Sequence, residues 1–171
     1  MFGFEGGKTP ATAATERKQM HPLEGMAGLM DWASKNSAYN LKFIPEEKLG
    51  WKPAPTANSA FEIVKHVCGA VNGGLGVMRA GTWGAMEAPL PASLAEAQQM
   101  LETAGEEYAA ALRGVDPATL GNKIMLFGHI EMPIGRAVTL PVIDMVHHHG
   151  QFAYIQALLG DTDFHFREMG T

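Results

Sequence analysis

The chain has 171 residues and a net charge of -5, and 46% of its residues are hydrophobic. This length fits one domain that can bury a sizeable core, and the acidic balance, with no basic run longer than two residues, argues against a nucleic-acid surface. The single cysteine, Cys68, excludes an internal disulfide and suits a reducing cytoplasm. We expect no signal peptide and no membrane contact, since no apolar run approaches the roughly 18 residues of a membrane span.

Residues 1–18 combine Gly, Thr and Ala with scattered charge, and they predict a flexible N-terminal arm before a bundle domain over 19–171. From His21 to about Phe43 the apolar residues recur at helical spacing. This pattern predicts an amphipathic first helix, which Pro45 ends.

The second and third helices are both predicted to begin with a capping box. Ser59 to Glu62 opens the second helix, which runs to about Arg79, and Ser93 to Glu96 opens the third. Gly69 and Gly73 lie on one side of the second helix. Their missing side chains predict close approach of a neighbouring helix.

The connection over residues 114–136 is long and irregular, and its segment 124–132 is either a short hairpin or an irregular excursion. Thr139 is predicted to cap a fourth helix that reaches about Leu159, and residues 161–166 are expected to trail off as a tail. Four amphipathic helices without a convincing sheet predict an all-α fold, a four-helix bundle.

The fourth helix carries the residues that point to chemistry. At about 100° per residue, one face of it holds Asp144, His147, His148 and Gln151, whereas His149 is predicted to point to solvent. Burying imidazoles beside a carboxylate is costly unless something pairs them, and a metal ion does so economically. Asp144 and His148 have the i, i+4 spacing that lets one helix grip one ion. His147 is a competing ligand or a hydrogen-bond donor behind the ligands, and Gln151 is placed to bond to them.

A facing helix must supply a third ligand, and His66 is the best candidate. It lies in mid-helix among apolar residues and is expected to face the bundle interior, unlike His21, His129 and His165. The alternative is a core histidine that a backbone carbonyl holds. Two histidines and one carboxylate would leave open positions on a divalent ion, which suits Ni, Zn, Fe(II) or Mn. An open position could activate water or hold a substrate thiolate.

Three segments of the chain, residues 44–53, 59–66 and 148–160, resemble the DinB-like family (the DinB/YfiT superfamily). The first is similar to the family's connector after helix one, and the second to the start of its second helix with the histidine there. The third, HHGQFAYIQALLG, resembles a fourth-helix signature that usually reads His-Arg-Gly-Gln, then Tyr-Leu-Arg and a closing Gly.

The resemblance implies an up-up-down-down four-helix bundle, frequent homodimers and a metal site of three histidines. By position these three fall on His66, Asp144 and His148, so the chain departs from the family at Asp144. Either the site is two His and one Asp, or His147 has become the ligand, or metal binding has been lost.

The residues and the resemblance together predict a metal-dependent enzyme that binds one divalent metal between the second and fourth helices. It would act on a small-molecule substrate by thiol transfer, isomerisation or hydrolysis, as a thiol S-transferase or a hydrolase. The alternative is a non-catalytic, stress-associated bundle with a structural or vestigial metal site. A polar core cluster without any metal is the third reading.

Overall fold

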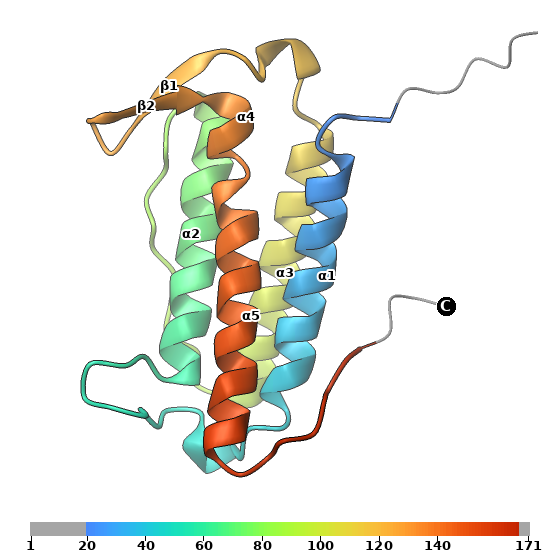
Figure 1. Ribbon diagram of the computed structural model, residues 1–171. Helices are drawn as coiled ribbons and strands as arrows, with labels where there is room; N and C mark the ends of the chain where they lie inside the picture. Colours follow the sequence, from blue (N-terminus) through green and yellow to red (C-terminus); the bar gives the residue numbers. More distant parts are fainter. Residues whose placement is uncertain (1–19, 168–171) are drawn as a thin grey trace, which may run out of the picture.

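The computed structural model describes residues 20–167, so the predicted arm over 1–18 lies outside the described residues. Its four long helices are α1 (Glu24–Leu41), α2 (Ala60–Ala80), α3 (Leu94–Arg113) and α5 (Leu140–Leu158). They form one four-helix bundle around an apolar core, as predicted (Figure 1). None of the helices within residues 20–167 combines the length and the apolar character needed to cross a membrane.

The helix directions follow from contacts at the helix ends. His21, before α1, bonds through Nε2 to the carbonyl oxygen of Val115, just after α3, at 2.8 Å. Gln98, at the start of α3, donates to the carbonyl oxygen of Ala38, near the end of α1, at 2.8 Å. The helices α1 and α3 are therefore antiparallel, and α1 runs in the same direction as α5 (Figure 1).

In chain order the directions are up-down-down-up, so the expected order up-up-down-down is wrong. The physical reason lies in the connections. The link between α1 and α2 stays at one end of the bundle, whereas the loop between α2 and α3 runs back along the bundle before α3 begins (Figure 1). This loop makes α2 and α3 parallel neighbours, and it brings residues 81–91 along the side of α2.

The helix starts agree only in part with the predicted caps. At α2 the capping box is confirmed, because Ser59 Oγ accepts from the Glu62 N–H while the Glu62 carboxylate accepts from the Ser59 N–H. At α3 the Glu96 carboxylate accepts from the Ala92 N–H instead of completing the box. Thr139 does not cap α5, since the short helix α4 (Ile134–Ala137) precedes it and the Thr139 hydroxyl donates to the Arg136 carbonyl oxygen.

Two segments outside the long helices also have defined structure. Strands β1 (Lys123–Leu126) and β2 (Ile130–Pro133) pair antiparallel, which settles the connection in favour of a hairpin. The expectation of a trailing tail is wrong. The His165 ring stacks on the Phe43 ring, with centroids 3.5 Å apart, and the Arg167 N–H donates to Asn36 Oδ1 at 2.9 Å. The segment after α5 therefore packs back onto α1.

The closest approach of α1 and α3 depends on Gly105. A Cβ at this position would overlap the Oγ and Cβ atoms of the buried Ser34 on α1. Because Ser34 Cβ is fixed by the α1 backbone, only a shift of the two helices could relieve the overlap.

We predict that Gly105→Ala lowers the free energy of unfolding by about 1–3 kcal/mol, since the helices must separate. Gly28→Ala is the matched control in α1, where an added Cβ meets nothing within 4 Å. It should raise the free energy of unfolding by about 0.5–1 kcal/mol, because alanine loses less entropy in a helix. Urea denaturation of both variants measures the difference; equal effects would contradict the assigned helix contact.

Candidate metal centre

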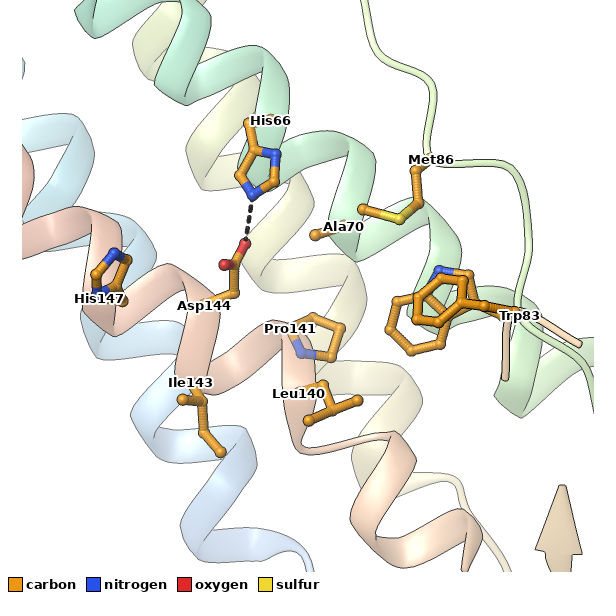
Figure 2. A pocket seen from close by; sticks show the side chains of 10 residues that line it. His66, Ala70, Trp83, Met86, Leu140, Pro141, Ile143, Asp144 and His147 are labelled. Atoms are coloured by element: carbon orange, nitrogen blue, oxygen red, sulfur yellow. Dashed lines mark ion pairs between the residues drawn. The ribbon is translucent and has the colours of Figure 1, made fainter. Parts of the chain in front are cut away.

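His66 of α2 and the residues Asp144 and His148 of α5 come together where these two helices face each other. Each residue offers a ligand atom, and the three atoms lie within 4.8 Å of one another. His66 Nε2 is 3.3 Å from Asp144 Oδ2, and His148 Nε2 is 3.5 Å from Asp144 Oδ1. Figure 2 shows the His66 and Asp144 side chains pointing toward each other across the helix pair. The three residues could together hold a metal ion.

The cluster lies on the boundary between core and solvent. The exposed fraction of the side chain is 8% for His148, 28% for Asp144 and 44% for His66. The expectation that His66 faces the bundle interior is therefore wrong. Apolar neighbours on both sides of His66 suggested burial, but its position on α2 falls at the edge of the contact with α5, where one side of the ring stays open. The cluster is accessible from the His66 side.

The carboxylate of Asp144 is the electrostatic centre of the site. Its Oδ2 atom is buried and has no hydrogen-bond partner among the described residues. Burial raises the pKa of Asp144, but the nearby rings of His148 and His66 outweigh this effect, so that its pKa is lowered overall. The carboxylate is thus kept in its anionic form, which is the form that binds cations.

Gln151 holds the His148 ring from behind. Its Oε1 atom lies 2.7 Å from His148 Nδ1, and its Nε2 atom lies 3.0 Å from His147 Nε2. An amide oxygen only accepts, so His148 Nδ1 donates to it, and the other ring nitrogen, Nε2, faces Asp144. Gln151 thus bonds to both histidines. His147 lies outside the group of three, but its ring packs edge-on against the His148 ring, with centroids 4.9 Å apart.

The remaining histidines take part in other contacts. His129 bonds to the Phe127 carbonyl oxygen in the hairpin turn, and His165 bonds to the Asp161 carboxylate. The prediction that His149 points to solvent is wrong. Its ring is half-buried and packs edge-on against Trp32, with centroids 5.4 Å apart, because the segment after α5 covers this side of the bundle. This burial lowers the pKa of His149.

A pocket of about 450 Å³ opens beside the cluster, and it has His66, Asp144 and His147 in its wall (Figure 2). The rest of the wall is apolar and comes from α2, α5, the loop after α2 and the hairpin; it consists of Ala70, Trp83, Met86, Phe127, Leu140, Pro141 and Ile143. The sequence analysis missed Trp83, Met86 and Phe127 as functional candidates.

A signal for this loop was present in the glycines of α2. A Cβ at Gly69 would come within 2.8 Å of the Met86 carbonyl oxygen, and a Cβ at Gly73 would overlap the Trp83 ring. The prediction that these positions admit a close neighbour is correct, but the neighbour is the loop and not a helix. The parallel arrangement of α2 and α3 causes the difference, since the returning chain lies along the glycine face of α2.

The profile of the DinB superfamily matches residues 30–152 of the sequence, which is most of the chain. The chain belongs to the DinB superfamily. Two solved structures of DinB-like proteins are similar to it in fold. One, from Bacillus subtilis, has a TM-score of 0.68 and 20% sequence identity, and the match covers 83% of this chain and 96% of that one. The other, from Bacillus cereus ATCC 10987, has a TM-score of 0.66 and 18% sequence identity, and the match covers 82% of this chain and 95% of that one.

No curated protein sequence matches this DinB superfamily chain. The two structural similarities lie below 25% identity, so they establish the shared bundle and leave the chemistry of the site to its own residues. In this DinB superfamily protein the second residue of the cluster is a carboxylate, Asp144, between two imidazoles.

We predict that Gln151→Leu weakens the binding of a divalent cation at this cluster by about 10–100-fold, because the His148 ring loses the acceptor that fixes its proton on Nδ1. Gln151→Glu keeps an acceptor, and its affinity for the cation should lie within a few-fold of that of the wild type. Isothermal titration with Zn²⁺ or Ni²⁺ measures both. Gln99→Ala, an exposed glutamine on α3, is the control; equal binding by wild type and Gln151→Leu would contradict the role of Gln151.

Proposed function

We propose that this protein is a metal-dependent enzyme that binds one divalent cation through His66, Asp144 and His148. It would use this centre on a small molecule held in the adjoining pocket, by thiol transfer, isomerisation or hydrolysis. The single observation that carries the proposal is the buried Oδ2 atom of Asp144, which accepts no hydrogen bond from the described residues although His66 Nε2 lies 3.3 Å away. An anionic oxygen in this position is costly without a cation.

The orientation of His148 supports the same conclusion. Because its Nδ1 atom bonds to Gln151, its Nε2 atom is the one turned toward the Asp144 carboxylate. In the neutral ring that nitrogen carries a lone pair, and a metal cation between the lone pair and the carboxylate would be attracted by both. Nitrogen and carboxylate donors of this kind suit Zn, Ni, Fe(II) or Mn, and this donor set leaves the identity of the metal open.

The arrangement also suits catalysis. His66 is open on one side and lies in the pocket wall, so a substrate atom could approach the three ligands from the pocket. A divalent cation supplies Lewis-acid chemistry, which lowers the pKa of a water molecule or thiol that it binds. The side chains of His66 and Asp144 would orient that group, while the apolar wall excludes bulk water.

We predict that the protein, purified without a histidine tag and supplied with metal, contains about one equivalent of divalent cation, as one such site holds one ion. His148→Ala and Asp144→Ala should each retain less than about 0.1 equivalent, because two ligands do not close the site. Elemental analysis by mass spectrometry is the measurement. Stoichiometric metal in either variant would refute the proposed ligand set.

Two further variants sharpen this experiment. His129→Ala, in the hairpin turn, is the control for loss of an unrelated histidine and should keep full occupancy. His147→Ala tests the alternative ligand and should also keep full occupancy, since His147 lies outside the group of three ligand atoms. A metal-dependent, saturable turnover of a thiol with an electrophile would then support catalysis. A metal that raises the melting temperature without any turnover would support a structural site.

A further inference from the structure

Three of the residues that line the pocket beside the candidate metal centre come from segments outside the four long helices. Trp83 and Met86 come from the loop after α2, and Phe127 comes from the turn of the hairpin. Figure 2 shows Met86 and Trp83 on the loop side of the pocket and Leu140, Pro141 and Ile143 on the α5 side. The loop and the hairpin contact each other here, since the centroids of the Trp83 and Phe127 rings lie 5.6 Å apart.

Phe127 has two properties that packing does not explain. It is the only non-glycine residue with a positive φ, 51°, within the part of the chain that the structure describes. The turn itself imposes this conformation, because the His129 N–H donates to the Leu126 carbonyl oxygen across Phe127 and Gly128, as in a type I′ hairpin turn, and a bulky aromatic residue is unusual there. Its side chain is nevertheless 55% exposed, so the burial of Phe127 in the core does not compensate for this conformation. The exposed ring is instead part of the pocket wall.

The charges in the pocket are as informative as its apolar wall. Among the described residues that line it, none is Lys or Arg, and Asp144 contributes an anionic carboxylate. A ligand that carries carboxylate or sulfonate groups on its body would lose its hydration there without gaining a cationic partner. An uncharged apolar body has no charged group whose hydration would be lost, and it would bury the exposed Phe127 and Ile143 side chains.

We propose that this pocket selects an uncharged, largely apolar small molecule, whose body lies between the Trp83–Met86–Phe127 wall and the Leu140–Ile143 stretch of α5. Its reacting group would then point to His66 and Asp144. The assignment of a reaction rests on the proposed metal-dependent function. The binding of the apolar body does not rest on that function. It depends on the apolar wall of the pocket, whereas the candidate metal ligands lie at the pocket's edge.

Two fluorescent probes test the proposal on metal-free, full-length protein. N-phenyl-1-naphthylamine is neutral, and 8-anilinonaphthalene-1-sulfonate has the same aromatic framework with one added sulfonate. We expect the neutral probe to bind saturably with one site per chain, and the sulfonate to bind about tenfold more weakly. Tighter binding of the sulfonate, or no saturable binding of the neutral probe, would overturn the proposal.

Variants locate the binding. Phe127→Ala should weaken the binding of the neutral probe about fivefold, because an aromatic contact is lost. Met125→Ala is the matched control, since Met125 is equally exposed on the same hairpin but lies outside the pocket. Ile143→Lys should shift the preference toward the sulfonate by adding a cation at the exposed edge. Equal affinity in the Phe127 and Met125 variants would refute the site.

The outcome also separates the two proposals. Metal content is measured on the same preparations after reconstitution. Loss of probe binding in a protein that takes up one equivalent of metal refutes the apolar pocket alone. Probe binding that depends on Phe127 in a protein that takes up no metal supports the pocket and refutes the metal-dependent function alone.

Discussion

Asp144 brings a negative charge into the contact between α2 and α5, where its Oδ2 atom accepts no hydrogen bond from the described residues. Two imidazoles, one from each helix, lie next to this charge. Gln151 in turn fixes the ring of His148, and it links His147 to the same network. The polar groups of this region are therefore arranged around one carboxylate, in a geometry that could hold a metal ion.

The pocket depends on the order of helix directions. Because α2 and α3 are parallel, the chain must return along the bundle between them, and it does so over the glycine face of α2. Gly69 and Gly73 let Met86 and Trp83 approach the helix closely, and these two side chains form the wall opposite α5. This helix order, which differs from the expected one, thus also creates the pocket beside the candidate metal centre.

Local sequence patterns predicted the parts of the structure that depend on local physics. Helix periodicity gave all four long helices, and the Ser59–Glu62 capping box was confirmed because its bonds lie within one turn. The i, i+4 spacing of Asp144 and His148 fixed their shared face on α5. The same reasoning failed for His149 and His66, whose exposure depends on which distant segment covers them: the segment after α5 covers His149, and nothing described covers the open side of His66.

The sequence by itself determined the four helices and the shared face of Asp144 and His148, since these follow from periodicity and from spacing on single helices, and its motifs carried the family resemblance and the choice of His66. Only the tertiary structure decided the helix directions, the packing of residues 161–167 on α1, and the joining of Trp83 and Phe127 in one pocket wall. The reason is that such contacts join residues far apart in the chain. Loop paths set their distances, and no periodicity within a helix records the path of a loop.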